Sequence, residues 1–186
     1  MVRVIAGQYR NRRLKTLEGT STRPTSDRLK ETLFNVLQSR IPGARFLDAY
    51  AGCGSIGIEA LSRGAAWVAF VEQSPQAEKI VLENLKQLSG LSESEYCVLR
   101  MPIEQALKRL SQFDQKFDIV FLDPPYAAKD EYPRVFLQLQ ANHLLSNSAL
   151  VIAEHSRRYG LEDSFGGLVR YRQIQEGDSI LSFYQP

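Results

Sequence analysis

Short apolar runs alternate with segments of helical periodicity between residues 45 and 154. The pattern predicts strands over 45–50, 66–72, 95–99, 117–122 and 149–154, and helices over 55–63, 75–88, 102–111 and 132–142. Such alternation favours a parallel sheet that is covered by helices on both faces. Two further strand-like runs, over 168–175 and 179–184, flank a Glu-Gly-Asp turn. We therefore expect an α/β fold with a mixed seven-stranded sheet.

The first 44 residues follow a different pattern. Residues 2–6 and 12–17 are short strand-like pieces around Gly7–Asn11, which predicts a hairpin. A helix is expected next, with Thr25 or Ser26 as its cap and an apolar face made by Leu29, Leu33, Val36 and Leu37. We therefore predict one domain in three parts, a basic hairpin arm over 1–20, a helix over 23–40 and a core over 44–186.

The composition favours a cytoplasmic protein with one well-formed core. The chain has 186 residues, 44% of them hydrophobic, and no apolar run approaches the roughly 20 residues of a membrane span. Cys53 and Cys97 form neither a Cys-x-x-Cys pair nor a disulfide framework. We expect both to be buried, inert thiols, and we expect no metal site and no contact with a membrane.

The charge is distributed unevenly. Residues 1–30 carry eight Lys or Arg residues against two acidic residues, whereas the rest of the chain carries 15 basic and 19 acidic residues. A basic arm on a mildly acidic body favours binding of a polyanion through one end of the molecule. A hairpin whose basic side chains are simply solvated is the alternative.

A glycine-rich loop follows the first strand of the alternating region. Gly52 and Gly54 allow a tight turn close to a ligand, and Gly57 permits close packing of the next helix. Glu72 ends the following strand, where a carboxylate can accept hydrogen bonds from ribose hydroxyls. This spacing also fits a dinucleotide site. However, Asp48 before the loop would repel a pyrophosphate and suits a cationic ligand such as S-adenosylmethionine; its alternative role is to cap the turn.

The stretch Asp118–Tyr126 is the most informative. An apolar run ends in Asp-Pro-Pro-Tyr, and because neither proline can donate a ladder hydrogen bond, the strand must stop there. Asp123, the Pro124 carbonyl and the Tyr126 ring are thereby placed at the carboxyl end of a strand, where ligands bind in open α/β sheets. Two acceptors and a flat ring suit a planar heterocycle that carries an amino group.

Together these motifs resemble the RsmD family, class I S-adenosylmethionine-dependent methyltransferases of bacteria that modify a guanine N2 in 16S ribosomal RNA. The resemblance is carried by the hairpin 4–10, the Arg-Pro-Thr helix 23–35, the glycine loop 47–64, the Asp-Pro-Pro-Tyr motif and the tail 176–184. It covers nearly the whole chain. The loop and Asp-Pro-Pro-Tyr occur in many methyltransferases, so the basic hairpin and the Arg-Pro-Thr helix carry the narrower assignment.

The resemblance implies a Rossmann-like fold and transfer of a methyl group to an exocyclic amine. It implies catalysis by Asp123, Pro124, Pro125 and Tyr126, S-adenosylmethionine binding by Asp48, Gly52, Gly54 and Glu72, and RNA contacts from Arg10, Arg12, Arg13, Lys15, Arg23 and Arg28. For Arg23 and Arg28, bracing of the pocket is the alternative. Arg100-Met101-Pro102 replaces the acidic or amide residue that many class I enzymes place near adenine, so we expect backbone and apolar contacts there.

The expected partner is 16S ribosomal RNA within the 30S subunit or an assembly intermediate, bound by a monomer. Methylation of adenine N6 or of a glutamine amide is the second enzymatic interpretation, because both use related Asp/Asn-Pro-Pro-aromatic loops. A non-catalytic RNA-binding protein and an NAD-dependent oxidoreductase are the remaining alternatives.

Overall fold

The computed structural model describes residues 2–17, 27–113, 116–125 and 130–186. The strands of its main sheet are β3 (Arg45–Asp48), β4 (Trp67–Val71), β5 (Tyr96–Leu99), β6 (Phe117–Leu122), β7 (Leu145–Ser156), β8 (Ser164–Phe165), β9 (Leu168–Glu176) and β10 (Ser179–Gln185). Their order is β5-β4-β3-β6-β7-β10-β9-β8. Strands β5, β4, β3, β6 and β7 are parallel to one another. Strands β10, β9 and β8 extend the sheet through antiparallel pairs. The predicted mixed α/β sheet is confirmed.

The sheet has one strand more than the predicted seven. The addition is β8, whose two residues Ser164 and Phe165 pair with Val169 and Leu168 of β9. A two-residue strand is too short to produce an alternating hydrophobic pattern, so it could not be recognised from the sequence.

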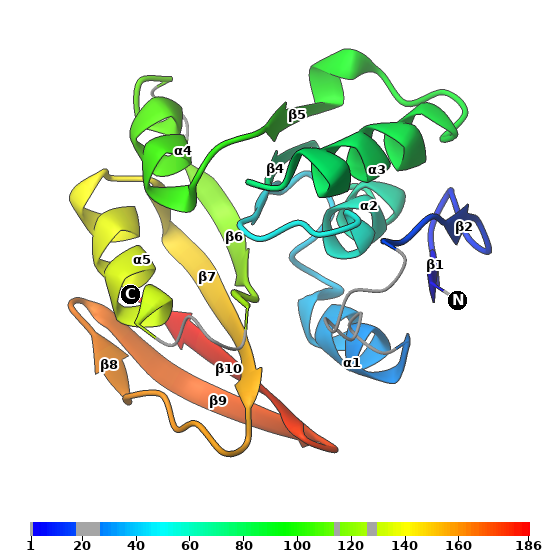
Figure 1. Ribbon diagram of the computed structural model, residues 1–186. Coiled ribbons are helices and arrows are strands. Elements are labelled where there is room, and N and C mark those ends of the chain that lie inside the picture. Colours follow the sequence, from blue (N-terminus) through cyan, green and yellow to red (C-terminus); the bar gives the residue numbers. More distant parts are fainter. Residues whose placement is uncertain (1, 18–26, 114–115, 126–129) are drawn as a thin grey trace.

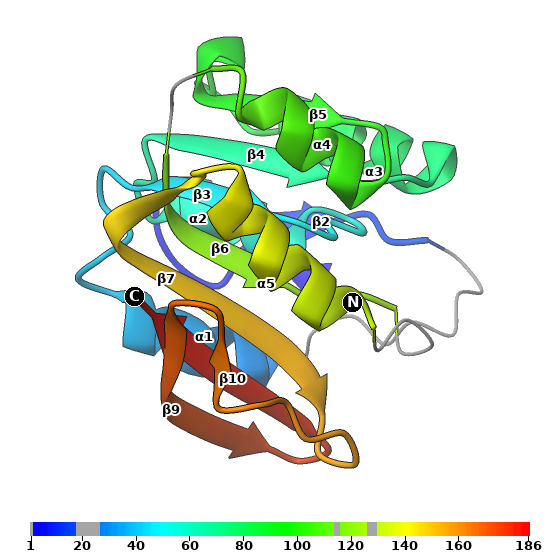
Figure 2. The ribbon, with the colours of Figure 1, turned by 90° about the vertical axis from the view of Figure 1, so that its left-hand side faces the viewer.

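Within the described residues, five α-helices cover the two faces of the sheet. They are α1 (Asp27–Leu37), α2 (Ser55–Ser62), α3 (Pro75–Lys86), α4 (Ile103–Leu110) and α5 (Glu131–Ala141); a short 3-10 helix, η1 (Glu93–Glu95), precedes β5. Helices α1, α2 and α3 lie on one face, and α4 and α5 lie on the other (Figures 1 and 2). Among the described residues, none of the helices is both long and apolar enough to cross a membrane.

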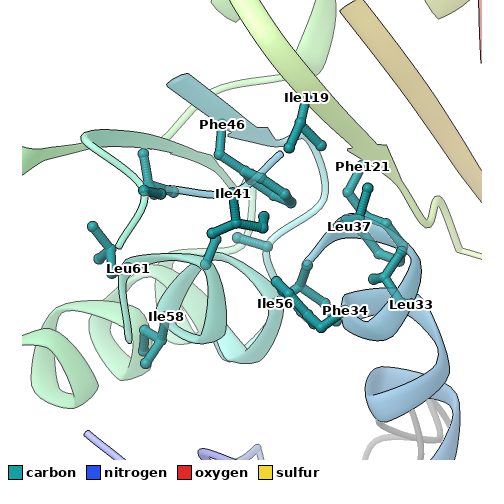
Figure 3. Packing of buried hydrophobic residues seen from close by; sticks show 14 of the residues in the cluster. Leu33, Phe34, Leu37, Ile41, Phe46, Ile56, Ile58, Leu61, Ile119 and Phe121 are labelled. Atoms are coloured by element: carbon teal, nitrogen blue, oxygen red, sulfur yellow. The ribbon is translucent and has the colours of Figure 1, made fainter. Parts of the chain in front are cut away.

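The alternation of side chains along each strand divides the core into two layers. Phe46 and Phe121 point toward α1 and α2, where they pack with Leu33, Phe34 and Ile56 (Figure 3). The next residues, Leu47 and Leu122, belong to the layer under α4 and α5. Because the inner parallel strands β4, β3 and β6 are buried on both faces, their register is fixed by packing from both sides.

The N-terminal segment forms a small hairpin beside α2 and α3 (Figure 1). Its strands β1 (Val2–Arg3) and β2 (Arg13–Leu14) pair antiparallel, which is shorter than the predicted pieces. Helix α1 lies within the predicted range 23–40 and ends at Leu37. Its expected caps, Thr25 and Ser26, lie outside the described residues.

The order of the strands creates a switch point between β3 and β6. These strands are neighbours, although β4 and β5 come between them in the sequence. The connections therefore leave β3 and β6 in opposite directions along the sheet, and the space outside their carboxyl ends is where ligands bind in open α/β sheets.

Candidate active site

Four neighbouring strands each end in a carboxylate. Glu72 follows β4, Asp48 ends β3, Asp123 follows β6, and Glu154 lies near the end of β7. These strands are adjacent and parallel, so the four residues lie along one edge of the sheet, on both sides of the switch point. The structure thus brings together three acidic residues that the sequence indicated and adds a fourth, Glu154.

Asp48 is buried at the start of the glycine loop. Its Oδ2 accepts a hydrogen bond from the Gly57 backbone N–H at 2.9 Å, which is the turn-capping role that the sequence left open. Burial raises the pKa of Asp48 to about 7, the Gly57 hydrogen bond opposes this rise, and the Glu72 carboxylate adds to it. A positive charge bound beside Asp48 would favour its ionised form, so the two roles are compatible.

The loop between β3 and α2 depends on its glycines. Gly52 and Gly54 have φ angles of 55° and 80°, a region that side chains disfavour. A Cβ at Gly52 would meet no atom within 4 Å, so the loop borders open space there. A Cβ at Gly57 would lie 2.3 Å from the Phe70 ring, which confirms that this glycine permits close packing of α2 against the sheet.

Glu72 organises the loop as well as ending its strand. Its Oε2 accepts a hydrogen bond from Gly52 N at 2.9 Å, and its Oε1 accepts one from Ser74 N at 2.8 Å. The side chain thereby joins the glycine loop to the beginning of α3. Since each carboxylate oxygen can accept two hydrogen bonds, these contacts leave acceptor capacity for the hydroxyls of a ribose.

Asp123 and Glu154 each follow a residue of the parallel β6–β7 ladder, because Leu122 pairs with Ala153 directly before them. Burial raises the pKa of Asp123 well above its ordinary value, and the carboxylates of Glu154 and Asp48 raise it further. Glu154 is buried, and its Oε1 accepts a hydrogen bond from Ser179 Oγ at 3.2 Å. Carboxyl groups held this closely favour a ligand that donates hydrogen bonds or carries positive charge.

The prolines of the motif act on the strand as expected. Strand β6 ends at Leu122, with the buried Pro124 and the exposed Pro125 following Asp123. Tyr126 lies outside the described residues, and its stacking role therefore stays a prediction.

The predicted RNA-binding residues fall into two groups. Arg10, Arg12 and Arg13 are exposed and line a shallow hollow with Gln8, Tyr9, Asn11 and Gln87. The ion pairs found within the described ranges involve none of these three arginines. In contrast, Lys15 pairs with Glu83 at 2.8 Å and Arg28 with Glu176 at 2.9 Å, so both are already partnered on the protein. Arg23 lies outside the described residues.

The residues after β5 contact both the core and α3. Met101 packs against the core layer under α4 and α5, while Arg100 lies 3.5 Å from Glu78 of α3. Arg100 is thus partnered on the protein, and the backbone and apolar contacts expected to adenine stay a prediction.

Glu154 could have been found from the sequence. It follows the apolar run 149–153 as Asp123 follows 119–122, and a search for carboxylates at the end of each predicted strand would have included it. Tyr50 offered no such signal. Its hydroxyl donates a hydrogen bond to Glu131 Oε2 at 2.6 Å and so ties the glycine loop to α5, a contact between residues 81 positions apart.

Comparison with known proteins agrees with this arrangement. The family model described as "Conserved hypothetical protein 95" matches residues 2–185. The protein YlbH of Bacillus subtilis is 37% identical over 185 residues, covering 99% of this chain and 98% of the relative. "Ribosomal RNA small subunit methyltransferase D" of Haemophilus influenzae is 36% identical over 183 residues, covering 94% and 93%.

The chain belongs to the RsmD family. The solved structure of yhhF from Escherichia coli superposes on it with a TM-score of 0.84 at 29% identity, covering 99% of this chain and 97% of that one. The Rossmann-like fold of this chain is that of the class I methyltransferases. S-adenosylmethionine is the methyl donor of the RsmD family and hence the cofactor of this chain.

Proposed function

We propose that this protein transfers a methyl group from S-adenosylmethionine to the exocyclic N2 amine of a guanine in 16S ribosomal RNA. The observation that carries the proposal is the pair of carboxyl groups, Asp123 and Glu154, which directly follow the paired residues Leu122 of β6 and Ala153 of β7 beside the glycine loop. Membership of the RsmD family and the names of its ribosomal RNA methyltransferase relatives support the substrate class.

The glycine loop and its acidic neighbours fit the cofactor. The open space at Gly52 allows the backbone to approach a ligand, and Glu72 has acceptor capacity for ribose hydroxyls. Asp48 is assigned to the positively charged methionine end of S-adenosylmethionine. A cation beside it would stabilise the ionised carboxylate and so lower the pKa that burial raises. The cofactor supplies an electrophilic methyl group on a sulfonium, a charged group without any phosphate.

Asp123 and Glu154 favour guanine over adenine. The Watson–Crick edge of guanine presents two neighbouring donors, N1–H and the N2 amino group, whereas adenine presents an acceptor at N1. Asp123 would accept a hydrogen bond from the reacting amine, with the Pro124 carbonyl as second acceptor, and Glu154 would accept from N1–H. An adenine in the same position would set its N1 lone pair against the Glu154 carboxylate.

The protein's part in the reaction is orientation and electrostatic stabilisation. An aromatic amine is a weak nucleophile because its lone pair is delocalised into the ring. Two acceptors on its N–H groups turn the nitrogen toward tetrahedral geometry and stabilise the positive charge that develops on it. Each charge-assisted hydrogen bond contributes about 1.5–3 kcal/mol, and stacking on Tyr126 would contribute about 1–3 kcal/mol.

The RNA reaches the site through the basic arm. Arg10, Arg12 and Arg13 would bind backbone phosphates, which gives affinity without sequence information. The target base must leave its stack to enter the pocket, so an unpaired guanine in an assembled 30S subunit or its precursor is the expected substrate. We also propose that the protein acts in the cytoplasm, where ribosomes are assembled, and that it acts as a monomer.

The decisive test identifies the methylated product. Labelled S-adenosylmethionine is incubated with naked 16S RNA, 30S particles, DNA or protein from a strain that lacks this gene, and nucleosides and amino acids are then separated. The proposal expects N2-methylguanosine in RNA. N6-methyladenosine or methylglutamine would contradict it and would support the alternative acceptors.

A further inference from the structure

One buried side chain connects the hairpin arm to the glycine loop. Asn84 on α3 has no exposed surface, and its amide contacts both segments. Its Oδ1 accepts a hydrogen bond from Lys15 N at 2.8 Å, while its Nδ2 donates to Lys15 O at 3.0 Å and to Cys53 O at 2.9 Å. Cys53 lies between Gly52 and Gly54, so a single amide joins the arm and the loop.

The chemistry of the site requires an amide. The two Nδ2 hydrogens of asparagine match two carbonyl acceptors, and its oxygen matches a backbone donor. A carboxylate at position 84 would face the carbonyls of Lys15 and Cys53 without a proton to offer either. Because Asn84 is buried, loss of these bonds would leave backbone groups of both segments unsatisfied.

A second connection joins the other side of the arm to the helix that follows the loop. Glu59 of α2 accepts hydrogen bonds from Ile5 N at 2.7 Å and Ala6 N at 3.0 Å. One side of the arm is therefore attached to α2, which leads directly out of the glycine loop, and the other side to Asn84 of α3, which bonds the loop itself at Cys53. These contacts provide a route by which a conformational change of the loop can reach the arm.

We propose that Asn84 is a positioning residue that couples occupation of the glycine loop by cofactor to RNA binding by the arm. This inference rests on the proposed function, since it takes the loop as the cofactor site and the arm as the RNA site. In the proposed coupling, the conformation in which Asn84 bridges both segments is the one that binds S-adenosylmethionine at the loop and RNA at the arm. A ligand that orders one segment thus lowers the cost of ordering the other.

The coupling is measured as a ratio of RNA affinities. The dissociation constant of transcribed 16S RNA is determined with and without saturating S-adenosylhomocysteine. We expect wild type to bind RNA at least about fivefold more tightly with the cofactor product present, the lower end of typical coupling between sites. In Asn84→Ala and Asn84→Asp this ratio should fall toward one.

The matched control is Glu83→Gln. Glu83 is the neighbour of Asn84 and contacts the same arm residue, but through the exposed Lys15 side chain rather than through the loop. This variant should keep the wild-type ratio even if its RNA affinity changes. A loss of the ratio in Glu83→Gln equal to that in Asn84→Ala would contradict a specific role of Asn84.

A measurement on wild type alone keeps the inference testable if the Asn84 variants do not fold. Hydrogen exchange at the Lys15 amide, which donates to Asn84 Oδ1, should slow when S-adenosylhomocysteine binds. Unchanged exchange, or RNA affinity that ignores the cofactor in wild type, would overturn the coupling while leaving the proposed function intact. A protein that binds neither RNA nor S-adenosylhomocysteine would overturn both.

Discussion

The sheet edge and the hairpin arm position their charged groups in opposite ways. At the edge, Asp48, Asp123 and Glu154 are placed by the register of the doubly covered parallel strands β3, β6 and β7. In the arm, the two strands are only two residues long, and a two-stranded hairpin of this size has little stability of its own. The edge is positioned by the core, whereas the arm must be attached to it.

The attachment uses the backbone of the arm and buried polar side chains of the core. Glu59 has no exposed surface, receives the Ile5 and Ala6 N–H groups, and is paired with Arg63 at 2.8 Å and Lys30 at 3.6 Å. This leaves the side chains of Arg10, Arg12 and Arg13 in solvent. The carboxyl groups proposed for catalysis are thus confined at an electrostatic cost, while the arginines proposed to bind RNA stay exposed because main-chain groups hold their segment.

The largest effect is expected at the edge. Asp123→Ala removes the proposed acceptor for the reacting amine and should lower the methyl-transfer rate by about 10²–10³-fold or more. Affinity for S-adenosylhomocysteine should change less than about threefold. Single-turnover transfer of labelled methyl groups and calorimetric binding measure the two quantities. Glu93→Ala, which removes an exposed carboxylate remote from the edge, serves as the control; wild-type turnover in Asp123→Ala would exclude its catalytic role.

The next effect concerns attachment of the arm. A Cβ at Gly7, whose φ is 82°, would lie 1.8 Å from the Ser62 carbonyl oxygen, so Gly7→Ala must displace the arm. We expect about 3–5 kcal/mol loss in free energy of unfolding, or detachment of the arm with at least about tenfold weaker RNA binding. Binding of S-adenosylhomocysteine should suffer far less than RNA binding.

Gly43→Ala is the control that separates the steric clash at Gly7 from the strain of a side chain at positive φ. Gly43 has a similar φ of 78°, but a Cβ there meets no atom within 4 Å. Its substitution should therefore cost only about 1–2 kcal/mol. Equal losses of RNA affinity in the two variants, measured by filter binding, would contradict attachment through the contact at Gly7.

The same contrast explains what could be predicted from sequence. The parallel strands were recognisable because burial on both faces produces apolar runs, and Asp123 could be placed because two prolines must end its strand. Glycine spacing likewise located the loop. These features depend on a few consecutive residues, and local chemistry determines them.

The attachment of the arm could not be predicted in this way. Asn84 lies 69 positions from Lys15 and 31 from Cys53, and Glu59 lies 54 from Ile5. An asparagine or a glutamate on a helix is ordinarily solvated, and no local pattern distinguishes one that is buried against a distant backbone. The two-residue strand β8 could not be predicted for a related reason, because only its hydrogen-bonded pairing with β9 identifies it as a strand.

The electrostatic cost at the edge can be measured through stability. Asp48 has a pKa of about 7 in the folded protein against an ordinary value of 3.8, so between these pH values the folded state binds a proton that the unfolded state has lost. The free energy of unfolding should therefore fall as pH rises through this window. Asp48→Asn cannot ionise and should gain about 2–4 kcal/mol relative to wild type between pH 4 and pH 8.

Urea unfolding of the ligand-free protein at several pH values gives this difference. Asp130→Asn, at an exposed residue whose side chain caps no helix, is the control and should shift little with pH relative to wild type. If the difference in free energy of unfolding between Asp48→Asn and wild type were constant across this pH range, Asp48 would have an ordinary pKa. The edge would then carry no electrostatic cost at Asp48, and this contrast between the edge and the arm would be wrong.

The smallest effect is expected where the charges are free. Replacing Arg10, Arg12 and Arg13 by alanine should weaken RNA binding about tenfold near physiological salt and should reduce the slope of log affinity against log salt by up to about 2–3. Folding stability should hardly change, because these side chains are exposed and the arm is held by its backbone. Arg158→Ala, an exposed arginine far from the arm in sequence, should leave the slope intact. A large loss of stability in the triple variant would mean that the arginines attach the arm rather than bind RNA, which would reverse the division between the two regions.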